Sequence, residues 1–232
     1  MIKIENTEVV GWEAAIRGMR NPMNSWALSD SGTCADKLCD CENYVHCHMS
    51  HCIGPNDLAL MTRLRNAGMD HRKFMRMIIV TFDLTAPLYW WKEFDTYKVG
   101  TVANSCSTMH KIHAKEFTLD DFSCEHLMVS GTEIIMRTIK VLNDCRNAYV
   151  NYENWNNGGY AKPLKKDLWW QMIQILPTSY NQKRTILLNY EVLANIYKSR
   201  RNHKLDEWHD LCHWVETLPY SELITGKGDG ID

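Results

Sequence analysis

The chain has 232 residues, of which 45% are hydrophobic and 23% charged, and its net charge at pH 7 is −2. This length is enough for one large domain or two small ones around a sizeable core. The charge argues against a protein built mainly to hold nucleic-acid backbone, and no apolar run approaches the roughly 20 residues that cross a bilayer. Because the first residues lack the apolar stretch of a signal peptide, we expect a cytoplasmic protein without a membrane partner.

The first twenty residues predict a short strand, marked by Ile2 and Ile4, and then a helix. Thr7 is the expected N-cap. The helix should end at Asn21, because a residue before proline avoids the helical region. Helical spacing gives this helix one apolar stripe, made of Trp12, Ala15, Ile16 and Met19.

Cysteine and histidine crowd into residues 34–52. In a reducing compartment this clustering favours metal ligation over disulfides. Zinc takes four such ligands and can fold a loop that has few apolar residues. The spacing matches no standard finger, so which four bind stays open, and the alternative is a loop of reduced, partly exposed cysteines. The candidates for a structural zinc are Cys34, Cys39, Cys41, His46, Cys47, His48, His51 and Cys52.

A helix, a strand and an aromatic segment follow. Asn56 should cap the helix and Gly68 should end it. Residues 77–85 are rich in β-branched and aromatic side chains and predict a buried strand. Pro87 favours the start of another helix, which carries a dense aromatic run of Tyr89, Trp90, Trp91, Phe94 and Tyr97.

Gly100 breaks this helix into a loop of small polar residues. Hydrogen-bonding groups beside large aromatic side chains suit a planar, phosphorylated ligand. The alternative is a buried aromatic helix followed by a polar turn.

The second half of the chain is mostly helical. Ser130 and Glu133 form a predicted capping box for a long central helix that ends near residue 153. A loop around 154–160 and a tail at 226–232, which should be disordered, interrupt or end the regular structure. The other predicted elements are a helix over 163–176, an extended segment over 179–189, and helices over 190–203 and 205–220.

Arg200 continues the apolar stripe of the predicted helix 190–203. A buried arginine needs an anionic partner, because an unpaired buried charge is costly. A bound phosphate would satisfy it. The alternatives are a salt bridge to Glu191 or Asp206, or a side chain that reaches water.

The order of these features resembles that of the flavin-dependent thymidylate synthases (ThyX). The family carries a histidine before a strand, here His71, sixteen residues before the Pro of Ala86-Pro87. Its motif RHRxxSxNExSxR lies over residues 97–109, YKVGTVANSCSTM, in which Asn104 and Ser107 match. Leu176-Pro177 matches a later "LP", and the C-terminal signature NLRNLxxFLxLR is matched at Asn189, Asn195 and Arg200.

The departures from the family pattern lie at charged positions. Tyr97, Lys98 and Val99 stand at the RHR triplet, and the Glu and the final Arg of that motif become Ser105 and Met109. Glu191 stands at the position of the middle arginine of the C-terminal signature. In the family those arginines hold flavin and nucleotide phosphate, and each charge-assisted contact is worth roughly 1.5 to 3 kcal/mol.

The resemblance implies an α+β protein with a small antiparallel sheet and long helices, forming a homotetramer whose pockets lie between subunits. Since the sequence shows no repeat or linker, we expect a single domain over 1–225, with 34–52 as a Cys/His-rich insertion. By resemblance, FAD would contact His71, Asn104, Asn189 and Asn195. The nucleotide would contact Ser107 and Arg200.

Two functions follow from this resemblance. The first is reductive methylation, alkylating C5 of a deoxyuridine nucleotide with folate and FAD. The alternative is a catalytically inactive protein of the same fold that binds a pyrimidine deoxynucleotide or a partner protein and has a zinc-stabilised loop. A zinc-finger-like nucleic-acid binder is a weaker third, given the negative net charge.

Overall fold

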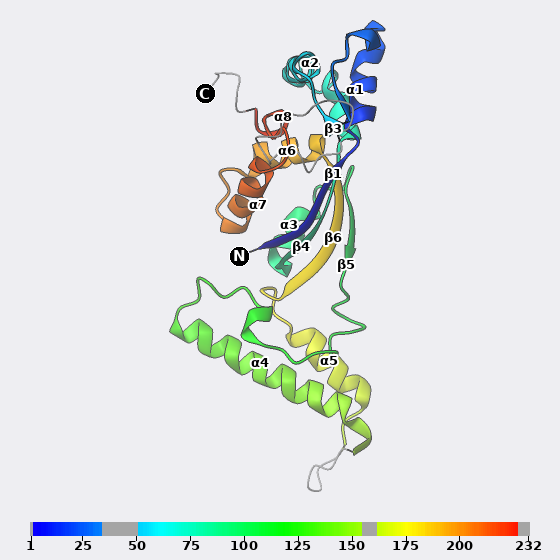
Figure 1. Ribbon diagram of the computed structural model, residues 1–232. Coiled ribbons are helices and arrows are strands. Elements are labelled where there is room, and N and C mark those ends of the chain that lie inside the picture. Colours follow the sequence, from blue (N-terminus) through cyan, green and yellow to red (C-terminus); the bar gives the residue numbers. More distant parts are fainter. Residues whose placement is uncertain (1, 34–50, 155–161, 227–232) are drawn as a thin grey trace. The chain divides into compact units, whose positions relative to one another are not determined.

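The computed structural model describes residues 2–33, 51–154 and 162–226 (Figure 1). The fold divides the chain into two compact units. We call Met1–Lys3, Thr85–Asp95 and Asn104–Arg184 the α4–α5 unit, and Ile4–Leu84, Thr96–Ala103 and Thr185–Asp232 the α6 unit. The single domain over 1–225 stays a prediction. The predicted tail beyond Gly226 and most of the predicted 154–160 loop lie outside the described residues.

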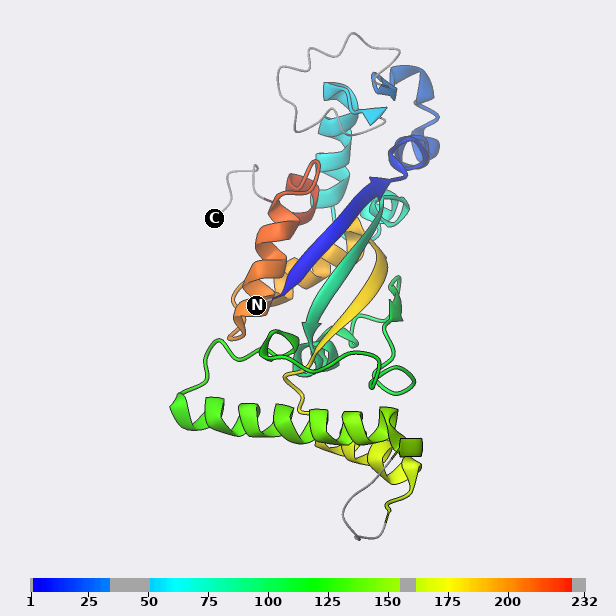
Figure 2. The same ribbon diagram turned by 60° about the horizontal axis from the view of Figure 1, so that its bottom comes forward.

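A small antiparallel sheet has the strand order β1-β4-β6-β5, and its three long strands lie side by side in Figure 2. Along β4, buried and half-buried residues alternate, as expected for a strand with one face on a core. The strands predicted at 77–85 and 179–189 are confirmed. The first strand is longer than expected, and the predicted loop after Gly100 contains a short strand. The bounds are β1 Lys3–Val10, β4 Ile79–Pro87, β5 Val102–Ser105 and β6 Asn181–Asn189.

A second sheet consists of two short antiparallel strands in the α6 unit. They are β2 Gly32–Thr33 and β3 His51–Cys52, with Gly32 opposite Cys52. The strands flank the predicted insertion, whose residues 34–50 lie outside the described residues.

The helices of the α6 unit bear out the predicted apolar stripes, whereas two predicted caps are wrong. Gly11, not Thr7, precedes the first helix. Its φ is +96°, and a Cβ at this position would lie 2.0 Å from the Met77 carbonyl oxygen, so glycine is required here. Gly54, not Asn56, caps the next helix, and Pro55 is its first residue. The elements are α1 Trp12–Arg20, η1 Asn21–Met23, η2 Trp26–Leu28, α2 Pro55–Asn66, η3 Arg72–Met77, α6 Tyr190–Arg200, α7 Asp206–Glu216 and α8 Glu222–Thr225.

The α4–α5 unit is built on two long helices that pack side by side (Figures 1 and 2). The predicted stripe of α4 is buried at Ile135, Ile139 and Leu142 and packs with Met172 of α5. The predicted capping box at Ser130 is wrong: α4 begins at Val129, with no side chain capping it. The elements are α3 Leu88–Phe94, η4 Leu119–Asp121, α4 Val129–Val150, η5 Tyr152–Asn154 and α5 Lys165–Ile175.

The aromatic run lies in α3, where Trp90, Trp91 and Phe94 are buried and their rings pack against one another. For this helix the simpler alternative, a buried aromatic helix, is correct. Within the described ranges, no helix is both long and apolar enough to cross a bilayer.

Candidate functional site

Helix α6 begins where β6 ends, at Asn189. The Asn189 Oδ1 atom accepts a hydrogen bond from the Val192 backbone N–H at 3.0 Å, which satisfies one of the free donors of the first turn. Asn189 is buried, so this cap fixes the start of the helix. Asn189 is one of the residues predicted to contact a cofactor. In the structure its side chain also caps α6.

An ion pair lies against the first turns of α6. The Nε atom of Arg72 lies 3.1 Å from Oε1 and 2.9 Å from Oε2 of Glu191, and Nη2 donates to Asn195 Oδ1 at 3.2 Å. Only the contact with Oε1 has hydrogen-bond geometry, so the buried Oε2 atom has no hydrogen-bond partner. Glu191 is 5% exposed and requires such a cation, since an unpaired buried carboxylate is costly.

A loop approaches the start of α6 at Gly100. This residue has a φ of +78°, and a Cβ here would lie 3.1 Å from Asn189 Nδ2 and 3.2 Å from Val192 Cγ2. The adjacent Thr101 has a buried Oγ1 atom without a hydrogen-bond partner. Two polar oxygens without hydrogen-bond partners, Thr101 Oγ1 and Glu191 Oε2, therefore belong to segments that flank Asn189.

Arg200 lies at the other end of α6 and is half-buried. Its Nε atom donates to the Tyr97 hydroxyl at 2.9 Å, and its guanidinium carbon lies 4.6 Å from the centroid of the Trp208 ring. Glu191, one of the two carboxylates considered as its partner, is bonded to Arg72 instead. The side chain is thus held by a phenol and aromatic faces, an arrangement that suits a guanidinium.

The remaining predicted binding residues lie in the α4–α5 unit. Asn104 is exposed in β5, and Ser107 follows that strand. The Ser107 Oγ atom accepts hydrogen bonds from the backbone N–H groups of Met109 at 3.2 Å and His110 at 2.8 Å. Ser107 therefore fixes a turn, which is a structural role that the sequence analysis did not anticipate.

Ser107 also lines a polar cavity of about 280 Å³. Lys115 and Asp121 form a hydrogen-bonded ion pair on its wall, and this bond is the main cause of a raised Lys115 pKa. Burial raises the pKa of Tyr180, which lines the same cavity. Gln182 donates to the Cys106 carbonyl at 2.8 Å and holds the strand beside it. The cavity thus presents hydroxyl, amide and ammonium donors to a small polar ligand.

The structure places Asn195 and Arg200 on α6 and Asn189 at its cap, and His71 directly precedes Arg72, which bonds Asn195. Asn104 and Ser107 belong to the other unit. The sequence analysis missed Arg72. It lies in the basic segment after His71, and the charge reversal at Glu191 was the signal that a nearby cation was required.

The predicted zinc ligands are only partly described. His51 and Cys52 form β3, and the six other candidates fall between residues 34 and 50. Among residues that the structure describes, no group of three or more His, Cys, Asp or Glu side chains is placed to hold a metal ion.

Comparison with solved structures decides the fold. The chain matches ThyX of Helicobacter pylori complexed with FAD and dUMP, with a TM-score of 0.63, 15% identity, and coverage of 97% of this chain and 98% of that one. A second Helicobacter pylori ThyX structure with FAD and dUMP matches with a TM-score of 0.62, 14% identity and 98% coverage of both chains. The chain has the ThyX fold. No family model matches the sequence, and no curated protein does.

The residues around α6 fit the FAD of such a ThyX complex only in part. Glu191 Oε2 and Thr101 Oγ1 are buried oxygens that could bond the polar edge of a planar ring. The pyrophosphate is poorly matched, because Glu191 is a buried carboxylate and Arg72 is already bonded to it and to Asn195. The side chains at this end of α6 therefore do not match the charge of the cofactor's pyrophosphate.

Proposed function

We propose that this chain binds a pyrimidine deoxynucleotide within a ThyX fold. The observation that supports the proposal is the fold match, which extends over nearly the full length of both chains and leads to structures that hold dUMP. Ser107 and Arg200 are the proposed nucleotide contacts. Within the α6 unit, the Tyr97-bound guanidinium of Arg200 suits a phosphate.

In its catalytic form the proposed activity is reductive methylation of a deoxyuridine nucleotide at C5, with FAD and folate. His71, Asn104, Asn189 and Asn195 are the proposed flavin contacts, of which Asn189 caps α6 and Asn195 lies on it.

The second candidate is a catalytically inactive protein that binds a nucleotide or a partner protein through the same fold. The Arg72–Glu191 pair favours it. At this end of α6 the chain presents a buried carboxylate and uses an arginine to neutralise it, so fewer cations remain for an anionic cofactor.

Calorimetric titration of the purified protein with dUMP and with deoxyuridine tests nucleotide binding. We expect dUMP to bind at least tenfold more tightly than deoxyuridine, and Arg200→Gln to reduce that difference. Arg76→Gln is the matched control, because Arg76 is an exposed arginine of η3 in the same unit. Failure of dUMP to bind, or an equal loss in the control, would overturn the proposal.

Flavin distinguishes the two candidates. A flavin absorption band in the purified or FAD-incubated protein, together with conversion of dUMP to dTMP in the presence of a one-carbon folate, supports the enzyme. Nucleotide binding without either result supports the inactive form. Glu191→Gln frees Arg72 from its carboxylate, so it should tighten FAD binding if this end of α6 meets the cofactor's phosphates.

We also propose a homotetramer, as the resemblance implies. Exposed apolar side chains recur every seven residues along and just before α4, at Leu127, Ile134 and Val141. This stripe differs from the buried one and would be covered by another subunit. A structural zinc in residues 34–52 and a cytoplasmic location remain predictions, the former open to metal analysis of the purified protein.

A further inference from the structure

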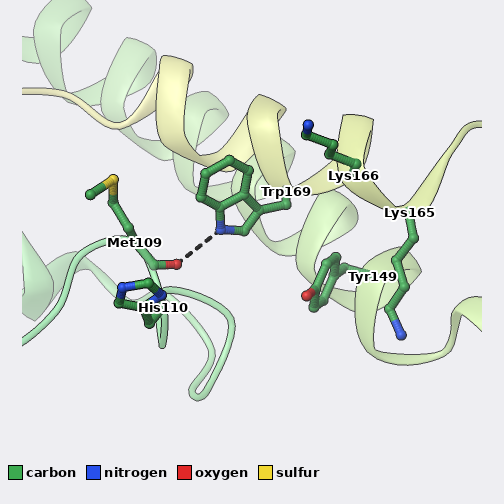
Figure 3. Close-up of a pocket in the computed structure, with 6 residues that line it drawn as sticks. All are labelled: Met109, His110, Tyr149, Lys165, Lys166 and Trp169. Carbon is green, nitrogen blue, oxygen red and sulfur yellow. Dashed lines mark hydrogen bonds between the residues drawn. The ribbon is translucent and has the colours of Figure 1, made fainter.

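A second cavity of about 480 Å³ lies on the α4–α5 unit, next to the turn that Ser107 fixes (Figure 3). Two helices and one turn form it: Tyr149 comes from α4, three residues come from α5, and two follow the Ser107 turn. Its size falls in the range that small-molecule sites occupy, roughly 300 to 1,000 Å³. The lining residues are Met109, His110, Tyr149, Lys165, Lys166 and Trp169.

The aromatic walls of this cavity are held in place. Trp169 Nε1 donates to the Met109 carbonyl at 2.9 Å, and Figure 3 shows this bond closing one side of the cavity. Ser107 Oγ fixes the backbone of Met109 and His110 from behind. Tyr149 packs against the His113 ring with centroids 4.7 Å apart. Both aromatic side chains are half-buried, so each offers a ring surface with little conformational freedom to lose.

The two lysines of the cavity lie at a helix N-terminus, where positive charge is unfavourable. Lys165 and Lys166 are the first two residues of α5, where the helix dipole disfavours positive charge by about 0.3 to 1 kcal/mol each. Asp167 in the same turn offsets part of this cost. Among the described residues, those that line the cavity include no acidic side chain. A position that breaks a local rule is where a functional reason is expected.

We propose that this cavity binds a planar aromatic ligand that carries an anionic group. The ring stacks on Trp169, and the anion pairs with Lys166 and with Lys165, whose Nζ atom lies 5.2 Å from the centroid of the Tyr149 ring. Lysines act as mobile point charges and accept phosphate or carboxylate, so a nucleoside monophosphate and a heteroaromatic carboxylate share the required chemistry. Neither Ser107 nor Arg200 lines this cavity, although Ser107 Oγ bonds the backbone of two residues that do.

Calorimetry with dTMP and with pterin-6-carboxylate tests the site and distinguishes the two sources. Thymidine and inorganic phosphate serve as half-ligands. We expect at least one complete probe to bind, its affinity to fall at least tenfold in the double variant Lys165→Gln/Lys166→Gln, and both half-ligands to bind much more weakly. The matched control is Lys140→Gln/Lys162→Gln, which removes the same charge from exposed lysines of this unit that do not line the cavity.

Each remaining outcome overturns the proposal. These outcomes are no binding by either complete probe, equal losses in the two double variants, or phosphate alone binding as tightly as dTMP. The dTMP titration is repeated in an Arg200→Gln background, so that the contribution of Arg200 to nucleotide binding is removed first. Binding that survives Arg200→Gln and is lost with the two lysines belongs to this cavity, whatever the outcome for dUMP.

Discussion

The Asp57 carboxylate should be a major determinant of the stability of the α6 unit, and Asp57→Asn tests this. The side chain is fully buried. Its Oδ1 atom accepts from Arg20 Nε at 2.6 Å, and its Oδ2 atom accepts from the hydroxyls of Ser29 and Ser31 and from the backbone N–H groups of Asp30 and Ser31. Two carboxylate oxygens thus receive five hydrogen bonds, which join α1, the segment after η2 and α2.

Two features of the structure determine how much unfolding free energy Asp57→Asn should remove. Arg20 is only 4% exposed, and removing the charge of its partner leaves a buried guanidinium, which costs about 3 to 5 kcal/mol. Burial tends to raise the pKa of Asp57, but bonds from Ser31, Ser29 and Arg20 prevail and hold the pKa at about 2, against 3.8 ordinarily. That difference corresponds to about 2.5 kcal/mol of stability at neutral pH.

Urea unfolding of the wild type, Asp57→Asn and Arg17→Gln measures the effect. The Glu13–Arg17 pair is a matched control: it lies on the same helix α1 at the same 2.6 Å, but its side chains are 71% and 63% exposed. Arg17→Gln should cost less than about 1 kcal/mol. Because the folded pKa is the lower one, the stabilisation is complete above about pH 4 and disappears as the pH falls toward 2. A loss in Asp57→Asn no larger than in Arg17→Gln, or an unchanged acid dependence, would refute the reasoning.

Three further outcomes are expected. Gly100→Ala should lower the unfolding free energy by about 1 kcal/mol or more in the same urea assay, because φ is +78° and the new methyl group would press on Asn189 Nδ2. Cys212 is buried and burial raises its pKa to about 11, so peptide mapping after iodoacetamide at pH 8 should show it unmodified while the exposed Cys106 reacts; equal labelling would contradict this. Ile134→Lys should lower the oligomeric state in sedimentation while leaving the circular dichroism spectrum unchanged, and an unchanged sedimentation coefficient would count against the α4 interface.

The periodic features of the chain were predictable because they are local. Apolar residues at helical spacing predicted the buried faces of α1, α4 and α7, and β-branched residues predicted β4. The helix ends were less predictable. Gly11 replaces the expected Thr7 cap because of a carbonyl from Met77, 66 positions away, and no local pattern reports such a contact. The same limit applies to Asp57, which reads from sequence as a favourable acidic residue in a first helical turn.

The sequence predicted where the candidate site residues lie along the chain, but not which side chains they bond. Asn195 and Arg200 were placed correctly on one helix and Asn189 at its start, since their spacing is local. Arg72 and Glu191 are separated by 119 positions, and only the fold brings them together. The hypothesis about the bound ligand depends on that pairing. A buried glutamate alone would suggest a cationic ligand, and an arginine alone would suggest an anionic one.

The charged residues around α6 depart from the ThyX pattern at positions that would bind a ligand, and not at the apolar positions that define the fold. Two positions where the ThyX pattern has arginine, Tyr97 and Glu191, bind arginines from elsewhere in this chain, Arg200 and Arg72. Arg200 stands where the pattern has its terminal arginine, Arg72 lies outside the motifs, and both guanidinium groups bond to protein groups. The fold depends on the buried apolar stripes, whereas ligand chemistry depends on a few side chains at the site. On the proposed function, an anion bound at Arg200 favours a nucleotide, and an anion bound at Arg72 favours the phosphates of flavin.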